Sequence, residues 1–264
     1  MINHADTAFR ANYHTHTPRC RHAGGSEREY IENAIAAGMT TLGFSDHTPY
    51  FFEGKYYSSF RMFPENFPEY FETLSTLKEE YKGRIEILIG LEAEYYPKHF
   101  GQLLDFIAPY QLDYMILGQH FTQNEYDGIY SGDPTNDERA LAQYTEQVIE
   151  ALHTGKFAYV AHPELLNFTG DKKTYRRWAL RLCEEAKALG IPLEINFLGF
   201  AGRRWYPRED FLAAAGETGS TVIFGCDAHS PDAIPNMPAF EGCMRLTEKY
   251  GLDRTEKIAL TLRK

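Results

Sequence analysis

The chain has 264 residues, of which 43% are hydrophobic and 24% charged, a length and composition that suit one large globular domain. Its 27 Lys and Arg against 37 Asp and Glu give a net charge of −10, which argues against a broad basic surface for nucleic acid or for an anionic membrane. The four cysteines form no CxxC pair, so we predict neither a disulfide framework nor a thiolate zinc site, and a cytoplasmic location fits them best.

The N-terminal segment, residues 1–11, holds no long apolar stretch, so we predict neither a signal peptide nor a membrane-spanning helix. Beyond it, short apolar runs alternate with longer segments of helical periodicity, and no low-complexity stretch divides them. We therefore predict a single domain over residues 1–264. The seven runs expected to form strands are residues 11–13, 41–45, 85–90, 114–118, 157–161, 192–196 and 221–225.

Helices are expected between these runs. After the first run, Ser26 and Glu29 have the spacing of a capping box, and Gly38 suits the left-handed residue that ends a helix. Alternation of strand and helix predicts right-handed βαβ units, and seven strands in this length favour a β/α barrel. The doubly wound alternative would place a GxGxxG motif after its first strand, and the sequence has none there. The other expected helices are residues 65–81, 100–108, 136–152, 172–189 and 208–218.

Two long loops interrupt the pattern, at residues 47–64 and 121–135. The first is rich in aromatic residues, and the second carries Asp127 and Asp133 among glycine and proline residues. Long ordered loops in compact domains tend to be functional, so we expect both to form walls of a pocket. The alternative is that the aromatic side chains only pack against the rim of the barrel.

Residue types that bind metals follow six of the seven predicted strands. In a β/α barrel the carboxyl ends of the strands converge on one face, where such folds place their chemistry. His22 lies in a glycine-containing loop that can fold back to the same face. The residues at the strand ends are His14, His16, His47, Glu92, His120, His162, Asp227 and His229.

The local spacing supports metal binding. His14 and His16 are two residues apart on a strand, which places both imidazoles on one side of the backbone, and Asp227 and His229 repeat this spacing. Seven imidazoles and two carboxylates exceed what one tetrahedral ion needs. They suit two or three ions with a bridging carboxylate such as Glu92.

Each of these residues also has an ordinary structural interpretation, since a single His after a strand is more often a core or surface group than a ligand. Glu94 lies two residues after Glu92 and is the alternative bridge. Asp46 points away from His47 by strand alternation, so we expect it to support a ligand rather than bind the ion. Three histidines are expected to have no role in the site, namely His4, His99 and His153.

Arginines near the predicted strand ends indicate an anionic ligand. Arg19 and Arg21 lie between His16 and His22, and Arg203 and Arg204 follow the one strand that supplies no metal ligand. Positive charge beside a metal cluster repels the ions, so a phosphate or carboxylate ligand explains it better. The alternative is that these arginines are solvated surface residues.

Taken together, these motifs resemble the polymerase and histidinol phosphatase (PHP) family over nearly the whole chain. Within that family, the Cys-x-His-Ala loop, the Ser-Asp-His-Thr-Pro stretch and the segment from Ile195-Asn196 to Tyr206-Pro207 look most like the stand-alone histidinol-phosphate phosphatases. The motifs that carry the family resemblance are His14-Thr-His16, Cys20-Arg-His22-Ala, Gly43-Phe-Ser-Asp-His47, Gly90-Leu-Glu92, Gly118-Gln-His120, Ala161-His162-Pro and Gly225-Cys-Asp227-Ala-His229.

The resemblance implies an α/β fold, a distorted seven-stranded, TIM-like (β/α)7 barrel of PHP type with three divalent ions (Zn, Mn or Fe) at its C-terminal face. Glu92 would bridge two of the ions. The sequence departs from the family pattern at one point. The resemblance implies a basic residue shortly after the His-Pro motif, and residues 164–170 contain none. The ligands implied by the resemblance are His14, His16, His22, His47, Glu92, His120, His162, Asp227 and His229.

The activity implied by the resemblance is hydrolysis of L-histidinol phosphate to L-histidinol and phosphate in histidine biosynthesis, with a hydroxide between two ions attacking phosphorus. Asp227 or His229 would protonate the leaving oxygen, and Glu92 would hold the ions. Glu94 and the aromatic loop at 51–60 are expected to contact the ammonium and imidazole of the substrate. The residues expected to bind the substrate are Arg203, Arg204, Arg19 and Asn196.

Other functions are open at this point. Another PHP phosphoesterase, a nuclease or a protein-tyrosine phosphatase, is the enzymatic alternative, and the acidic net charge counts against a nuclease. A non-catalytic metal-binding domain and a mononuclear amidohydrolase-type barrel are the others. We expect a small phosphomonoester as the partner, without nucleic acid or membrane, and leave the oligomeric state open.

Overall fold

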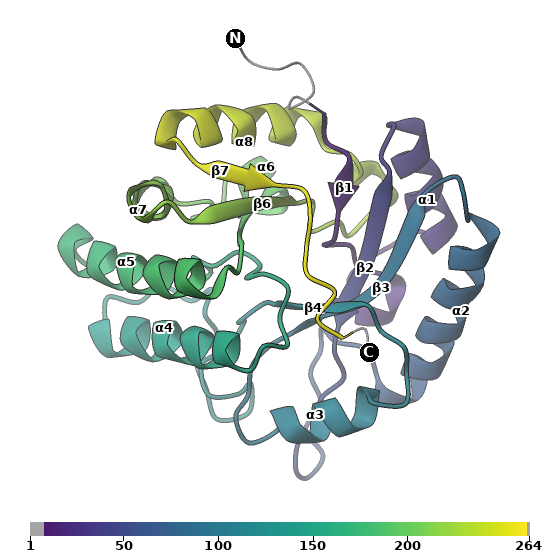
Figure 1. Ribbon diagram of the computed structural model, residues 1–264. Helices are drawn as coiled ribbons and strands as arrows, with labels where there is room; N and C mark the ends of the chain where they lie inside the picture. Colours follow the sequence, from purple (N-terminus) through teal and green to yellow (C-terminus); the bar gives the residue numbers. More distant parts are fainter. Residues whose placement is uncertain (1–7, 263–264) are drawn as a thin grey trace.

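In the computed structural model, which describes residues 8–262, the chain folds as an α/β protein with parallel strands inside and helices outside (Figure 1). The strands are β1 (Ala11–Asn12), β2 (Thr41–His47), β3 (Glu86–Ala93), β4 (Tyr114–Leu117), β5 (Leu193–Asn196), β6 (Thr221–Gly225) and β7 (Asp253–Thr255). The helices are α1 (Glu27–Ala36), α2 (Phe67–Glu80), α3 (Phe100–Ile107), α4 (Glu138–His153), α5 (Lys172–Leu189), α6 (Phe197–Ala201), α7 (Glu209–Thr218) and α8 (Met237–Tyr250).

The strands form a four-stranded sheet in the order β1-β2-β3-β4 and a three-stranded sheet in the order β5-β6-β7, all parallel. Isolated bridges of Val160 to Leu117 and to Leu193 lie between the two sheets, and Thr15 bridges Ala228 on the other side. The strands therefore curl, as a barrel requires, in two sheets of four and three strands.

This arrangement corrects two expectations. The run at 157–161 makes only the isolated bridges at Val160, although Ala158 N and Ala161 N donate to β4. The seventh strand is β7, which the sequence analysis did not predict because Asp253–Thr255 is short and polar.

Side chains alternate between the two faces of the strands. On β3, Ile87 and Ile89 join the large apolar cluster that also contains residues of the helices, whereas Leu88 joins a smaller cluster with Tyr114 of β4 and Ile223 of β6. Because the period of a strand is two, Glu92 lies on the same face as Leu88. The smaller cluster thus fills the interior between the strands, and polar side chains such as Glu92 occupy the same face at the carboxyl ends of the strands.

The helix signals in the sequence are confirmed where caps mark them. Ser26 and Glu29 form the reciprocal capping box of α1, and Gly190 and Gly219 end α5 and α7 in the left-handed conformation. The sequence analysis missed α6 and α8. The start of α8 lies among prolines, which are typical of loops, but a proline in the first helical turn costs no hydrogen bond.

The C-terminal segment runs across the amino ends of the strands (Figure 1). Its Ile258 and Leu260 pack against the smaller apolar cluster. We expect Leu260→Ala to lower the free energy of unfolding by about 1–2 kcal/mol, below the usual cost for a fully buried Leu because this side chain is only half-buried. Urea unfolding measures the change, and Leu189→Ala on the exposed end of α5 is the control. An equal effect of both substitutions would contradict the packing role of the tail.

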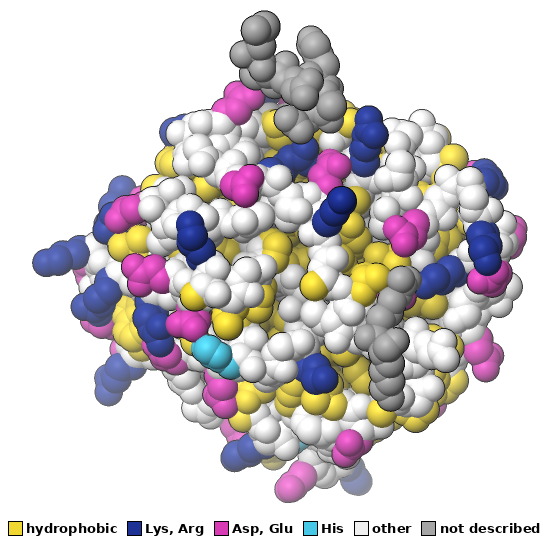
Figure 2. Space-filling view, viewed as in Figure 1, with side chains coloured by type: hydrophobic (Ala, Val, Ile, Leu, Met, Phe, Trp, Pro, Cys, Tyr) yellow, Lys and Arg dark blue, Asp and Glu magenta, His cyan; other side chains and the backbone are white. Residues whose placement is uncertain are grey.

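Charges of both signs are interspersed on the face seen in Figure 2, and the described residues on this face form no continuous basic area. Within residues 8–262, no helix has both the length and the apolar character needed to cross a bilayer.

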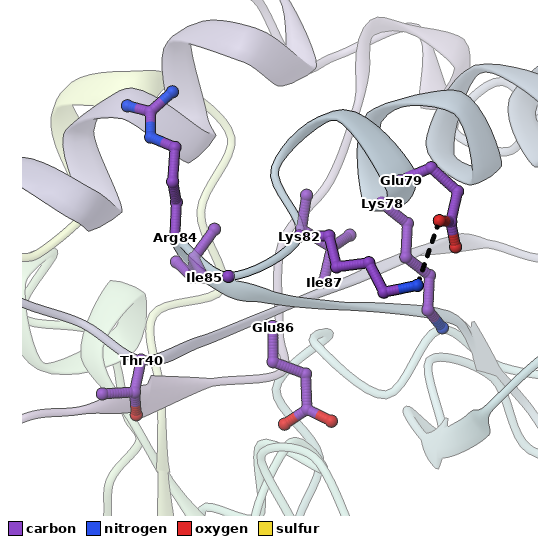
Figure 3. Close-up of a pocket in the computed structure, with 9 residues that line it drawn as sticks. Thr40, Lys78, Glu79, Lys82, Arg84, Ile85, Glu86 and Ile87 are labelled. Atoms are coloured by element: carbon purple, nitrogen blue, oxygen red, sulfur yellow. Dashed lines mark hydrogen bonds and ion pairs between the residues drawn. The ribbon is translucent and has the colours of Figure 1, made fainter.

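A cavity of about 540 Å³ lies at the amino end of β3, far along the strand from the predicted metal ligands (Figure 3). Three cations line it, but carboxylates already neutralise them: Lys82 lies 3.3 Å from Glu79, and Arg84 and Lys78 pair with Glu32 and Asp113. Paired cations at an exposed surface have little affinity left for a ligand, so we assign no function to this cavity.

Candidate metal centre

The carboxyl ends of the strands bring all nine predicted metal ligands to one cavity of about 490 Å³ or to its floor. Seven of the nine line the cavity, and His14 and His16 lie fully buried beneath them. The ring of His16 is 4.1 Å from that of His229 and 4.5 Å from that of His47. His22 folds back as expected, with its Nε2 atom 2.9 Å from His229 Nε2.

Glu92 is the centre of this cluster. Its carboxylate oxygens lie 3.0 Å from His162 Nε2 and 3.1 Å from His47 Nδ1. Nε2 atoms of three further histidines, His14, His16 and His120, lie 3.5 to 3.7 Å from the same carboxylate. Glu92 is only 1% exposed, so its side chain has almost no contact with solvent.

A second carboxylate stands behind three of these imidazoles. His14 Nδ1 lies 2.8 Å from Glu194 Oε1, and His120 Nδ1 lies 2.8 Å from Glu94 Oε1. For His16, the Nδ1 atom is 3.5 Å from a carboxylate oxygen of Asp46, on the outer side of β2 as predicted. A carboxylate at Nδ1 fixes the ring and leaves Nε2 free to bind an ion, which is the usual support of a metal-binding histidine.

Glu194 was missed in the sequence analysis. It lies on β5, the strand that supplies no predicted metal ligand, and its two oxygens face His14 Nδ1 and the backbone N–H of His162. The signal was present, because a glutamate in a short apolar strand of a buried parallel sheet needs a buried partner.

The donor atoms fit divalent cations. Among the described residues, His14 Nε2, His16 Nε2, His47 Nδ1 and Glu92 Oε2 are buried without a hydrogen-bond partner. Several sets of three donors lie within 4.8 Å of one another, among them His14, His16 and Glu92. Buried polar atoms without partners are costly, and imidazole with carboxylate suits Zn, Mn or Fe.

The electrostatics of the cluster favour ionised carboxylates and some neutral imidazoles. Burial opposes the charge of Glu92, but His47, His120 and His14 together hold its pKa well below its usual range. Burial lowers the pKa of His47 well below its ordinary value, and burial with the charge of His16 lowers that of His229 to about 3. Against the effect of burial, the carboxylate of Glu194 and its neighbours raise the pKa of His14 to about 10, and Asp227 and Asp46 raise the pKa of His16. An ionised carboxylate and a neutral imidazole are the forms that bind a metal, so an ion at His14 and His16 would displace protons.

Backbone strain marks two of the candidate ligands. Asp227 has a φ of 49° and His162 a φ of 31°, in the left-handed region that favours glycine. Asn196 donates through Nδ2 to Asp227 Oδ2 (3.1 Å) and to Glu194 Oε2 (2.9 Å). Since strain of this kind persists only where surrounding contacts impose it, the network holds Asp227 in place. Asn196 thus supports Asp227 and is not among the residues that line the cavity.

A sequence profile of the PHP domain matches residues 12–197 of the chain. The chain belongs to the PHP domain family.

Relatives of this PHP domain carry phosphatase names. A protein of Deinococcus radiodurans named "Probable histidinol-phosphatase" is 30% identical over 233 residues, which cover 84% of this chain and 86% of that protein. The "Histidinol-phosphatase" of Bacillus subtilis is 27% identical over 248 residues, covering 82% of this chain and 92% of the relative.

A solved structure shares the fold of this PHP domain. It is histidinol phosphate phosphatase from Lactococcus lactis, complexed with zinc, L-histidinol and phosphate. The TM-score is 0.73 at 21% identity, with 96% of this chain and 98% of the other covered. At this identity the likeness concerns the fold, a curled parallel sheet with helices outside.

The arginines of the PHP domain differ in position. Arg204 lines the cavity, where its Nη1 atom donates to Tyr206 Oη at 2.8 Å. Arg203 is exposed, as Arg204 is, but it does not belong to the cavity lining. Arg19 is paired with Glu27 and Glu69, so the structure does not support phosphate binding by this residue. The prediction for Arg19 did not take these carboxylates into account, because the sequence alone does not show that α1 and α2 bring them to Arg19.

The two long loops do form part of the cavity wall. Phe60 comes from the first loop, and Phe121 and Tyr130 come from the second. Phe51 and Phe52 pack elsewhere, against Phe106 and against rings near the start of α3. Of the aromatic side chains at 51–60, Phe60 alone lines the cavity, and contact with substrate stays a prediction. Three further lining residues, which the sequence analysis did not identify, are Leu165, Leu198 and Tyr206.

Of the histidines expected to have no role, His153 pairs with Glu185 on the surface and His99 precedes α3. Neither lines the cavity. His4 lies outside the described residues.

Proposed function

We propose that this PHP domain is a metal-dependent phosphomonoesterase that hydrolyses L-histidinol phosphate to L-histidinol and phosphate. The observation that carries the proposal is the carboxylate of Glu92 amid five imidazoles, on the floor of a cavity that Arg204 also lines. Relatives that cover most of the chain bear the name histidinol-phosphatase. The solved relative was obtained with zinc, L-histidinol and phosphate.

The nine candidate ligands fit three divalent cations, for which we propose Zn, Mn or Fe. Such cations, when bound, supply Lewis-acid stabilisation of phosphoryl oxygens and make water available as a nucleophile near neutral pH. Glu92 is the ligand best placed to serve two ions at once, because imidazoles approach both of its oxygens. The residues that would hold the cations are His14, His16, His22, His47, Glu92, His120, His162, Asp227 and His229.

Other side chains have separate tasks. Arg204 binds the phosphate, since it is the cation of the cavity wall that does not belong to the histidine cluster. Phe60, Phe121 and Tyr130 exclude water and offer apolar faces to the organic part of the substrate. Asp227 and His229 line the same cavity, and one of them would take the proton that the attacking water loses and pass it to the leaving oxygen. Glu94 is excluded from contact with substrate, because it lies buried behind His120.

The proposal extends to architecture and location. We propose that both sheets belong to one distorted seven-stranded barrel, and the bridges at Val160 and Thr15 support this because they lie where the two sheets approach each other. A single domain over residues 1–264 and a cytoplasmic location remain predictions from the sequence.

Chelation followed by controlled addition of metal tests the activity. We expect phosphate release from histidinol phosphate to stop after chelation and to return with Zn, Mn or Fe, in protein that binds close to three ions per chain. Single-stranded DNA and a phosphotyrosine peptide are tested in parallel. Full activity without metal, or preference for either polymer, would refute the proposal.

Arg204→Met is expected to raise the KM for histidinol phosphate by about 10-fold, because a charge-assisted contact to phosphate is lost from the cavity wall. Steady-state kinetics measure the change. Arg245→Met on the exposed face of α8 is the control. Arg203→Met distinguishes the two neighbouring arginines, and a larger effect there than at Arg204 would overturn this assignment.

A further inference from the structure

Arg61 is a fully buried arginine that no step of the proposed hydrolysis uses. It lies near the end of the 47–64 loop and is 0% exposed. Its Nη1 atom donates to Thr48 O at 2.8 Å, at the start of the same loop. Its Nε atom donates to Glu125 Oε1 at 2.8 Å, in the 121–135 loop. Its Nη2 atom lies 3.0 Å from Glu94 Oε1, just after β3. One guanidinium therefore holds three segments together.

The contact with Glu94 leads to the metal centre. The oxygen that Arg61 approaches, Glu94 Oε1, is the same atom that lies 2.8 Å from His120 Nδ1. Both Arg61 and His120 therefore contact one carboxylate oxygen, so the position of the arginine fixes the carboxylate that orients this imidazole. His120 in turn presents Nε2 toward Glu92.

The faces of the guanidinium are also occupied. Its central carbon lies 4.6 Å from the ring centre of Phe60 and 5.2 Å from that of Tyr50. Phe60 lines the cavity, where its ring centre is 5.2 Å from that of His47 and 5.7 Å from that of His120. The planar group thus supports an aromatic wall of the cavity as well as a candidate ligand.

Stability alone is a weak explanation for this network. Buried charges must be stripped of water, and replacing a buried ion pair with apolar side chains is often neutral or stabilising. A buried arginine between two carboxylates provides a fixed geometry, because the N–H groups of its planar guanidinium donate only in set directions. The fork of Arg61 is directed at two cavity loops and at the support of His120.

We infer that Arg61 is a positioning residue that joins the two cavity loops to Glu94, the carboxylate behind His120, so that one guanidinium supports both the substrate wall and the metal centre. The inference rests on the proposed function for the role of His120 as a metal ligand. Arg61 itself contacts neither the reacting atoms nor the cations.

Arg61→Lys tests the inference, since it keeps the charge and loses the fork. We expect the Kd for zinc, measured by competition with a chromophoric chelator, to rise about tenfold, as for other supporting groups of metal ligands. The KM for histidinol phosphate is expected to rise by a similar factor. Arg28→Lys is the matched control, because Arg28 makes a surface ion pair with Glu80 far from the cavity. It should leave both values unchanged.

Two further variants separate the branches of the network. Glu94→Gln is expected to raise the zinc Kd by about 10- to 100-fold. Glu125→Gln leaves the contact of Arg61 with Glu94 in place, so it should raise KM and leave the zinc Kd within about twofold. Glu125→Gln also tests the coupling of the loops if Arg61→Lys does not fold.

A purely structural role predicts a different result. In that case the variants would lower Tm while zinc Kd and KM stay at wild-type values, and the inference would be overturned. An unchanged KM in Glu125→Gln would likewise refute the coupling of the loops. If wild-type protein binds zinc and does not hydrolyse histidinol phosphate, the proposed function fails, and the zinc measurements still decide the role of Arg61.

Discussion

Glu92→Gln is expected to lower kcat/KM for histidinol phosphate by on the order of 10²–10³-fold, the range seen when one central electrostatic group of an active site is removed. The substitution keeps the volume of the side chain and removes its charge. Five imidazoles approach this carboxylate, so neutralising it removes the negative charge on which the whole cluster is centred. Metal content should fall together with activity, and elemental analysis of the purified variant measures it.

The control for this variant is Glu86→Gln, at the amino end of the same strand, β3. Glu86 is exposed and distant from the cavity, so activity and metal content should stay near wild-type values. If Glu92→Gln retained full activity with three ions bound, Glu92 could not be the bridging ligand, and the proposed site would need another centre.

The candidate ligands could be predicted because a strand has only two faces. Once a parallel barrel is assumed, a residue directly after an apolar run must lie at the carboxyl end, and residues two apart share a face. His14 and His16, and likewise Glu92 on β3, follow from this rule. Asp46 follows as well, because the opposite parity places it outside the interior, behind His16.

What supports the ligands was less predictable, because it depends on which segments the fold brings together. Glu194 meets His14 across 180 residues of sequence, and Arg61 meets Glu125 across 64. Arg19 shows the converse, because carboxylates on two helices neutralise it, although its position between two candidate ligands suggested a phosphate contact. Spacing along the chain specifies neighbours within an element and says little about partners between elements.

The strands raise a related difficulty. Apolar composition identified the run at 157–161 correctly as buried, yet only Val160 pairs with both neighbours. Apolar composition predicts that a segment is buried. Continuous strand pairing also requires a suitable backbone conformation over several residues, which composition does not predict. β7 is the opposite case, since its polar residues pair with β6 although their composition does not suggest a strand.

Gly118→Ala is expected to reduce kcat/KM by about a hundredfold, although glycine and alanine differ by one methyl group. Gly118 follows β4 directly, and a methyl group there would overlap with Oε1 and the carbons of the Glu92 side chain. The carboxylate must move to make room, and a displacement near 1 Å at a catalytic centre typically costs about 10²-fold in rate. The free energy of unfolding should fall by about 1–3 kcal/mol, as for other overpacked sites.

Gly101→Ala is the matched control for this substitution. Gly101 lies in α3, and a methyl group there meets no atom within 4 Å, so activity should be unchanged and the helix slightly more stable. Kinetics, metal content and urea unfolding of the two variants separate displacement of Glu92 from general destabilisation. The loss of activity is expected at urea concentrations well below the unfolding midpoint. A Gly118→Ala protein with full activity and full metal content would show that Glu92 can occupy another position. The close approach at β4 would then have no catalytic importance.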